Sequence, residues 1–455
     1  MTMVSTFEDL CGMQDVFINN IVLYLTKLDL VLLRLLSTVV KGHIGKNEPW
    51  KLIGERDMDL SSVFSTPSAP LFDEKEKRFV DVVEVETWED AYKGWVFFNE
   101  YVDGGVHPKH LLQSVRVWKR LTAILTQNIA SKDALPFQKS APSKSTFREF
   151  TRRNAPSSLK ALYAVRDGKM KGMALLGAFS VYDMKYAMFF VPASLFFAEL
   201  YSNPELIFNR DENYIPVGWS PGHQSILLLV HTAADNHPEG HVVMATAVRP
   251  TIVVCKTGIL DYLEEFTRRL EAGVYTCQSL RQGPNVVHAT LLFPESGPEV
   301  SDCTTNGVRV RASSLVMPQQ RPDEPLSFAY SIRITLTETG SACQLISRHW
   351  QFMDGNGNVR RVDGEGVIGK NPLLQRNGYV DLGVAYECRG QFVEGEFRYQ
   401  SLSGPVAGTG LAEGSGQASV SGTLLFAPGS MENPTGPPFH VTVGRFPLTF
   451  SLPKY

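Results

Sequence analysis

The sequence lacks the cysteine patterns that mark a metal site or a disulfide framework. Its six cysteines are scattered, with no CxxC pair and no nearby histidine at metal-ligand spacing. This scatter excludes a small disulfide-stabilised secreted module and favours a reducing compartment. We therefore expect no metal, no cofactor, and a cytoplasmic or nuclear location.

Long hydrophobic runs are also missing. The most apolar stretch, Ile18 to Val40, is interrupted by Lys27, Asp29 and Arg34, each of which is costly in a bilayer core. No secretory signal pattern precedes this stretch. The sequence therefore predicts no membrane partner.

Neither sign of charge dominates. The formal net charge is -3 over 455 residues, which gives no global field that would attract nucleic acid. With 43% hydrophobic and 20% charged residues, the chain has the composition of an ordinary globular protein. It is long enough for about three domains, and we expect no nucleic-acid partner.

The first sixty residues predict short helices with more apolar surface than they can bury. Phe17, Ile21 and Leu25 recur at helical spacing. Leu30 and Leu33 continue the pattern in a second predicted helix. So small a segment cannot bury all its leucines by itself, and an unburied apolar stripe favours a partner surface.

The runs LTKLDLVLLRLLS (Leu25 to Ser37) and PWKLI (Pro49 to Ile53) resemble a divergent F-box over residues 1–60. The segment lacks the Leu-Pro pair that commonly opens that motif. The resemblance implies a small all-α unit that docks on the Skp-type adaptor of a cullin-based ubiquitin ligase. The adaptor-binding residues that it implies are Phe17, Ile21, Leu25, Leu30, Leu33 and Trp50.

A polar, proline-containing interval follows, and we interpret residues 61–87 as a flexible linker. Trp88, Tyr92 and Trp95 then repeat at near-helical spacing. A second apolar set with helical spacing follows Pro108. These patterns predict connecting helices over residues 88–127.

The middle of the chain predicts an α+β domain. Thr146 and Glu149 have the spacing of a capping box, and three runs rich in β-branched residues precede a final helix. FREFTRRNAPSSLKALYAVRDG, FVPASLFF and the closing strands and helix resemble the SUKH family over residues 145–275. The resemblance implies a protein-binding module, and we interpret residues 276–302 as a linker.

The clearest local pattern lies between Leu345 and Pro372. Ile346, Trp350 and Phe352 share one strand parity, which is typical of a half-buried strand. The tetrapeptide at residues 354–357, Asp-Gly-Asn-Gly, tolerates positive φ and predicts a tight reversal. The sequence therefore predicts a β-hairpin here.

Gly364, Gly366 and Gly369 follow the hairpin with GxGxxG spacing. A dinucleotide site would need a helix directly after this motif, whereas Pro372 follows almost at once. We expect these glycines to serve the fold. The alternative that stays open is a site that binds or hydrolyses a nucleotide or pyrophosphate.

Two further strand patterns lie near the C-terminus. Residues 328–336 alternate cleanly between apolar and other side chains, so one face should be buried. Val443 and Phe446 lie on opposite parities of the last strand, so Gly444-Arg445 predicts a bulge that switches the face.

YSIRITL (Tyr330 to Leu336), QLISRHW, VDGEGVIGKNP and FPLTF resemble the ApaG domain and occur in that family's order. The resemblance implies an all-β, immunoglobulin-like or fibronectin-like sandwich over residues 303–455. It departs at residues 418–422, where the family usually has a methionine between small residues.

The order F-box, SUKH-like domain, ApaG-like domain resembles that of F-box proteins of the F-box/ApaG type. It implies a multidomain, non-catalytic substrate receptor of a Skp–cullin–F-box ubiquitin ligase. The basic hairpin favours an acidic or phosphorylated protein substrate, and a scaffold outside any ligase is the other alternative. The substrate-binding residues that we predict are Arg348, His349, Arg360 and Arg361.

Overall fold

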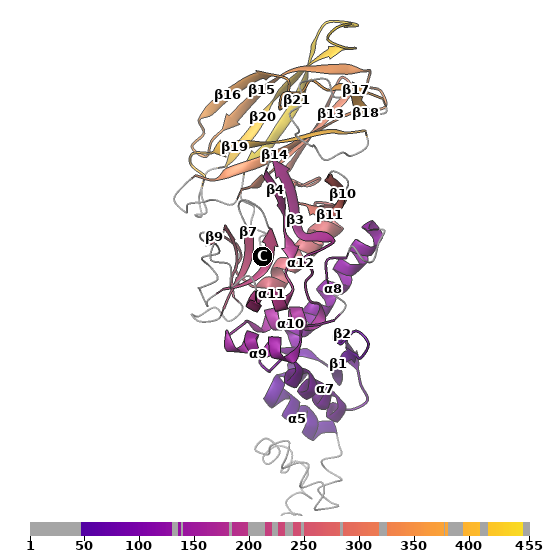
Figure 1. Cartoon of the computed structure of the whole chain (residues 1–455), viewed down its shortest axis with the longest axis vertical. Coiled ribbons are helices and arrows are strands. Elements are labelled where there is room, and N and C mark those ends of the chain that lie inside the picture. The colour runs from indigo at the N-terminus through magenta and orange to yellow at the C-terminus, as the bar shows by residue number, and fades with distance from the viewer. Residues whose placement is uncertain are drawn as a thin grey trace, which may run out of the picture. The chain divides into compact units, whose positions relative to one another are not determined.

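The computed structural model describes thirteen segments of the chain (Figure 1). They are residues 47–129, 135–137, 140–181, 184–198, 214–220, 226–232, 240–246, 250–282, 285–317, 325–376, 378–380, 395–409 and 417–448. Within these segments the chain is mixed α and β, with a β-rich C-terminal part. None of their helices is long and apolar enough to span a bilayer.

The described residues fall into two compact units. The first contains most of the described helices and one small hairpin, and it includes α8 only as far as Arg120. Its elements are α5 (Asn47–Met58), α6 (Leu60–Val63), β1 (Ser68–Asp73), β2 (Arg78–Glu84), α7 (Trp88–Tyr101), α8 (Pro108–Asn128), α9 (Lys144–Arg152) and α10 (Ser157–Val165).

The prediction of a flexible linker over residues 61–87 is wrong. This stretch forms α6 and the antiparallel hairpin β1–β2. The physical reason is aromatic burial, because Phe79 is fully buried and its ring lies 5.0 Å from that of Phe72 across the hairpin. The hairpin backbone is also tied to α7, since the indole Nε1 of Trp95 donates to Ser68 O at 2.8 Å.

The helices predicted over residues 88–127 are confirmed as α7 and α8. The capping-box prediction is wrong in position, because Ser143 is the N-cap of α9 and accepts from the backbone N–H of Thr146. Helix α10 is bound to α8 through the buried Trp118, whose indole N–H donates to Leu162 O at 3.1 Å.

The second unit begins with two sheets and two helices. One sheet has the order β10-β11-β3-β4 and the other β5-β6-β7-β8-β9. The strands are β3 (Met173–Val181), β4 (Met184–Ala187), β5 (Phe189–Phe190), β6 (Tyr214–Ser220), β7 (Ile226–His231), β8 (Val242–Thr246), β9 (Pro250–Cys255), β10 (Thr276–Gln282) and β11 (Asn285–Leu291); the helices are α11 (Ala193–Ala198) and α12 (Ile259–Glu271).

The predicted boundaries of this middle region need two corrections. Helices α9 and α10 belong to the first unit, so residues 145–275 do not form one compact body. Residues 276–302 are strands and not a linker, because β10 and β11 form a hairpin and β11 pairs in parallel with β3. The pairing buries Ala289 against Ala174 and Ala178 in one small apolar cluster.

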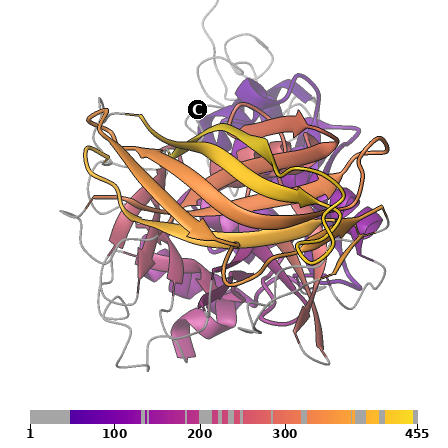
Figure 2. The same cartoon turned by 90° about the horizontal axis from the view of Figure 1, so that it is seen from above.

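The C-terminal strands form a two-sheet sandwich, which Figure 2 shows from above. The first sheet has the order β12-β13-β14-β19, and the second has β18-β17-β15-β20-β21 with β16 paired to β15. Their bounds are β12 (Val300–Thr305), β13 (Val308–Val316), β14 (Ser327–Leu336), β15 (Cys343–Met353), β16 (Val359–Glu365), β17 (Leu373–Gln375), β18 (Gly378–Val380), β19 (Phe397–Pro405), β20 (Ala418–Pro428) and β21 (Phe439–Leu448).

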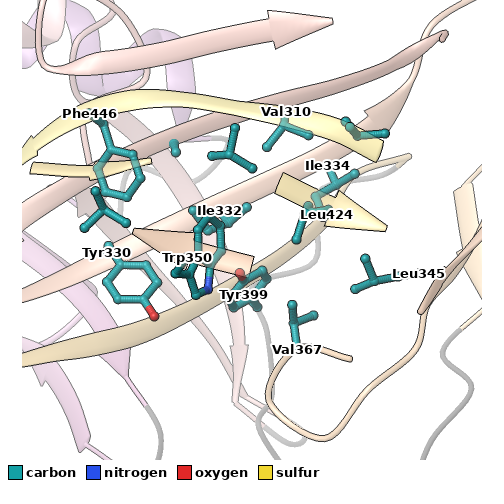
Figure 3. Close-up of a cluster of buried hydrophobic side chains, with 14 of the residues drawn as sticks. Val310, Tyr330, Ile332, Ile334, Leu345, Trp350, Val367, Tyr399, Leu424 and Phe446 are labelled. Atoms are coloured by element: carbon teal, nitrogen blue, oxygen red, sulfur yellow. The ribbon is translucent and has the colours of Figure 1, made fainter. Parts of the chain in front are cut away.

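The sandwich starts at Val300, a few residues before the predicted boundary of 303. Alternating apolar side chains of both sheets fill its interior, as Figure 3 shows for residues such as Ile332, Trp350 and Leu424. A bulge between Leu345 and Ser347 shifts the parity of β15, so Leu345 is the buried residue where the sequence pattern predicted Ile346.

The bulge predicted at Gly444-Arg445 is confirmed. In the β20–β21 pairing Val420 lies opposite Phe446 and Gly422 lies opposite Val443, which leaves two residues of β21 facing one of β20. Both Val443 and Phe446 consequently point into the core. The bulge also brings β21 close to β12, since a Cβ at Gly444 would lie 2.7 Å from Cys303 Sγ.

Both faces of β14 are buried, although its alternation predicted only one buried face. Ala329, Ser331 and Arg333 point away from the sandwich interior and are nonetheless inaccessible to solvent. Arg333 lies in a cluster of ionic side chains, where its guanidinium is 2.6 Å from Glu295 and donates to Pro294 O at 2.9 Å. Buried charge of this kind is tolerated because it is paired.

The predicted β15–β16 hairpin is confirmed. Asp354 N–H donates to Asn358 O at 2.9 Å, and Gly357 has φ 86° in the reversal. The Asp354 carboxylate accepts from the backbone N–H groups of Asn356 and Asn358, which fixes the loop conformation. The turn determines the register of the two strands that carry the predicted binding residues.

Candidate binding surfaces of the C-terminal sandwich

The four predicted substrate-binding residues divide between the two faces of one sheet. In the hairpin register Phe352 pairs with Arg360 and Gln351 pairs with Arg361. Arg360 therefore shares the inner face with Arg348, while Arg361 shares the outer face with His349. The three arginines of the basic hairpin therefore do not form one patch, because successive residues of a strand point to opposite sides.

The outer face carries a shallow groove of about 630 Å³. His349 and Arg361 line one wall, and Arg445 in the β21 bulge lies on the other. The bulge shapes this wall, since Gly444 and Gly422 add no side chain to the groove. Two guanidinium groups and one imidazole here face a single lining carboxylate, Asp363, so the groove suits an acidic or phosphorylated segment.

The outer face carries a chain of hydrogen bonds that the sequence analysis did not predict. Ser347 Oγ lies 3.0 Å from His349 Nε2, and His349 Nδ1 lies 2.9 Å from Asp363 Oδ1. This is the connectivity of a serine–histidine–aspartate relay. Counting outward from the Asp-Gly-Asn-Gly turn pairs residue 349 with residue 363, so the sequence did contain the signal.

The surroundings of this relay differ from those of a hydrolase. The side chains of His349 and Asp363 are 40% and 65% exposed, whereas a catalytic triad holds its carboxylate buried. At Ser347 the strand is paired on both sides, with Glu365 and Leu425, which leaves little free backbone N–H to stabilise an oxyanion. We therefore assign these contacts to the cross-strand stability of the hairpin.

On the inner face, Arg348 holds the glycine-rich turn in place. Its guanidinium NH1 donates to Glu365 O at 3.1 Å and to Gly366 O at 2.7 Å. Gly364 is its cross-strand partner, and a Cβ there would lie 2.9 Å from the same NH1 atom. A side chain at position 364 would therefore displace the arginine.

The glycine-rich stretch is a tight turn between strands. Gly366 and Gly369 have φ values of 54° and 74°, and Val367 and Lys370 exchange two backbone hydrogen bonds of 2.9 Å. The next element is strand β17 and not a helix. This geometry offers no helix N-terminus for a pyrophosphate.

The predicted adaptor-binding residues are mostly beyond what the structure describes. Phe17, Ile21, Leu25, Leu30 and Leu33 lie outside the described residues. Trp50 is described in α5, where its side chain is 3% exposed and its ring centre is 5.6 Å from that of Tyr92. Trp50 thus packs within the first unit, and its predicted part in adaptor binding stays a prediction.

Comparison with known proteins identifies the sandwich. Residues 318–401, which run from the end of β13 through the hairpin to β19, match the family model of the ApaG domain. The chain contains an ApaG domain. The ApaG proteins of Xanthomonas oryzae pv. oryzae show the same likeness, with 53% identity over 58 residues that make up 12% of this chain and 45% of theirs.

A second relative reaches beyond the ApaG domain in length. F-box protein SKIP16 of Arabidopsis thaliana is 38% identical over 209 residues, which are 43% of this chain and 41% of that protein. The chain thus spans less than half the length of these curated relatives. A crystal structure described as an ApaA protein from Bordetella pertussis is 28% identical and covers 32% of this chain and 95% of its own, with a TM-score of 0.23.

Proposed function

We propose that this chain is the substrate-recognition subunit of a Skp–cullin–F-box ubiquitin ligase. The observation that carries the proposal is its 38% identity to an Arabidopsis F-box protein together with the ApaG domain. The N-terminal segment binds the Skp-type adaptor, and the cullin-bound RING partner supplies the chemistry. This chain supplies proximity, because tethering a client makes ubiquitin transfer effectively intramolecular.

In this proposal the ApaG domain contacts the client protein through its β15–β16 hairpin. The outer groove presents Arg361 and Arg445 beside the partly exposed His349, an arrangement that suits an acidic or phosphorylated segment of a client. The tight glycine turn speaks against nucleotide chemistry as the function. The protein has no catalytic role of its own in this scheme.

The test is co-purification of the adaptor with the full-length chain. Replacing both Leu30 and Leu33 with Asp should abolish recovery of the Skp-type adaptor, because charges in an apolar interface stay unpaired. A matched control places the same charges at Leu71 and Leu112, which are 44% and 36% exposed in the first unit. Adaptor recovered at the original level from the Leu30/Leu33 variant would refute the proposal.

A further inference from the structure

A second cavity lies inside the ApaG domain, at the margin where β16 and β19 face each other. Its volume is about 310 Å³, near the lower end of the range for ligand pockets, about 300–1,000 Å³. Strands of both sheets line it, with Arg348, Trp350 and Arg360 on one side and Tyr330, Tyr399 and Ser403 on the other. Among the described strands β16 pairs only with β15 and β19 only with β14, so both are edge strands.

A residue that lines this cavity has an unsatisfied buried donor. Trp350 is 2% exposed, and its indole Nε1 has no hydrogen-bond partner among the described residues. The two other fully buried tryptophans, Trp95 and Trp118, both donate to backbone carbonyls. Buried donors are almost always bonded in proteins, so the unpaired indole N–H of a residue on the cavity wall favours a ligand that supplies the acceptor. Figure 3 shows Trp350 among the core side chains with the Tyr330 and Tyr399 rings near it.

The charge on the cavity wall is positive and unopposed. Arg348 donates to two backbone carbonyls, which do not neutralise its charge. Arg360 lies with its guanidinium 5.2 Å from the centre of the Phe352 ring, and neither arginine forms an ion pair within the part of the chain that the structure describes. The described lining residues include no Asp or Glu. This wall therefore favours an anion that accepts hydrogen bonds.

The rest of the wall is apolar. Phe352, Val362 and Ile368 line the cavity and are only partly buried, so they can still gain by excluding water. A ligand that matches all these features joins a carboxylate to an apolar group. The cavity has the volume for about one residue of a peptide. A terminal residue fits such a site, because the peptide continues out of the cavity in one direction only.

We propose that this cavity binds the carboxy-terminal residue of a client protein. The carboxylate accepts from the Trp350 indole N–H and is balanced by Arg348 and Arg360, while an apolar side chain contacts Phe352 and Ile368. The inference rests on the proposed role as a substrate receptor, and it names the client feature that is read. A free aromatic acid has the same chemistry and is the alternative source of the ligand.

Fluorescence anisotropy with the full-length chain tests the site. The probes are a fluorescein-labelled ten-residue peptide that ends in phenylalanine with a free carboxylate, and the same peptide as a C-terminal amide. The free acid should bind at least about tenfold more tightly, as expected for loss of a charge-assisted hydrogen bond. Equal binding of the two peptides, or no binding of either at millimolar concentration, would overturn the proposal.

Two exposed arginines give a matched pair of variants, because Arg360 lines the cavity whereas Arg376 lies outside both the cavity and the outer groove. Arg360→Gln should weaken binding of the acid peptide by about tenfold, whereas Arg376→Gln should leave it within about twofold. Both side chains are exposed, so neither change threatens folding. Equal losses in the two variants would place the peptide elsewhere and contradict the assignment.

Trp350→Phe removes the N–H and keeps an aromatic ring, and it should weaken the acid peptide while leaving the amide peptide unchanged. If this variant does not fold, the comparison of Arg360→Gln with Arg376→Gln decides whether the cavity binds the peptide. N-acetylphenylalanine that competes as well as the peptide would overturn a chain end as the occupant. Adaptor recovered at the original level from the Leu30/Leu33 variant, with peptide binding intact, would refute the ligase role and leave the carboxylate site standing.

Discussion

Burial controls the chemistry of single residues in this protein, and the thiols illustrate it. Cys255 and Cys343 are both 1% exposed, whereas Cys303 is partly accessible. Desolvation raises the pKa of the Cys343 thiol to about 12, because the thiolate loses its hydration inside the sandwich. A cysteine in this state is inert, since the thiolate is the nucleophile.

We expect Cys343 to resist alkylation in the native chain at pH 8. With a pKa of about 12 the thiolate fraction there is on the order of 10⁻⁴, and the side chain is also inaccessible. A short pulse of N-ethylmaleimide followed by mass spectrometry should label Cys303 well before Cys343. In denaturant the two should react alike, and prompt native labelling of Cys343 would contradict its burial.

Buried charge is the second residue-scale feature. Glu295 lies within 3.2 Å of three guanidinium groups, those of Arg311, Arg333 and Arg398, and its side chain is 9% exposed. Glu396 is the other carboxylate of this cluster. Three arginines thus share two carboxylates, so each carboxylate is needed to hold the buried cations.

Glu295→Gln should lower the free energy of unfolding by about 3–5 kcal/mol, because it leaves buried guanidinium charge uncompensated. Asp302→Asn is the matched control. This change breaks the ion pair between Asp302 and Arg309, whose side chains are 42% and 47% exposed, respectively. It should lower the free energy of unfolding by less than about 1 kcal/mol. Urea unfolding of both variants measures the difference, and equal losses would show that the cluster is not energetically special.

At the scale of elements, the β15–β16 hairpin and the turn that follows it organise the binding surfaces. The hairpin register puts Arg348 and Arg360 on one side and His349 and Arg361 on the other. The glycine turn then returns the chain to β17, which pairs with the start of β15. Changes in either turn should therefore disturb both surfaces.

Gly366→Ala should destabilise the protein more than Gly369→Ala. Both glycines have positive φ, which costs an alanine about 1–2 kcal/mol. At Gly366 the added Cβ would also lie 2.4 Å from Lys370 O, whereas nothing lies within 4 Å of a Cβ at Gly369. Thermal unfolding should rank the variants in this order, and a Gly366→Ala protein as stable as the original would refute a structural role.

The same turn should not bind phosphates. Calorimetry with ATP, GTP and inorganic pyrophosphate is expected to show no heat of binding, because the turn lacks a helix N-terminus. A micromolar signal that disappears in Gly366→Ala would support the nucleotide alternative.

The Asp354 loop makes the hairpin sensitive to acid. Hydrogen bonds from Asn358, with smaller contributions from the Asn356 and Gly357 N–H groups, hold the pKa of the Asp354 carboxyl below its ordinary value. A depressed folded-state pKa adds stability above the unfolded-state pKa of about 3.9, and this stability is lost as the pH falls through the folded-state value. Titration of the Asp354 carboxyl by NMR should give a pKa below about 3.9, the value of a free aspartate side chain. Titration at the ordinary value would contradict the loop geometry.

At the scale of the whole molecule, the proposed function assigns client binding and adaptor binding to different parts of the chain. The ApaG domain presents an outer groove and an inner cavity on opposite faces of one sheet. Under the proposed function the client is held there, while the N-terminal segment holds the adaptor. Variants of the two parts should therefore have separable effects.

The double variant Arg361→Glu, Arg445→Glu should reduce capture of clients and leave adaptor recovery unchanged. The reduction should grow as salt is lowered, since the exposed charges of the groove act through screened electrostatics. Arg376→Glu with Lys256→Glu makes the same change of charge at exposed positions outside the groove. Proximity labelling of the three proteins is the measurement, and an unchanged set of clients would place recognition outside the outer groove.

The sequence by itself determined the local features of the ApaG domain. The Asp-Gly-Asn-Gly turn, the alternation of β14 and the bulge at Gly444-Arg445 were all readable, because turn chemistry and side-chain parity depend on neighbouring residues. The division of Arg360 from Arg361 was also within reach, since a strand alternates faces at every residue.

Only the tertiary structure decided which of these residues share a site. The strands within residues 276–302 were not predicted, because β11 pairs with the distant strand β3. The local hairpin within residues 61–87 was not predicted, because burial of Phe79 and the hydrogen bond from Trp95 to Ser68 O stabilise it. Arg311 meets Glu396 across 85 residues of sequence, and the unpaired Trp350 N–H is a property of what surrounds it. Burial and long-range pairing arise from the packing of whole sheets, which no local pattern of side chains encodes.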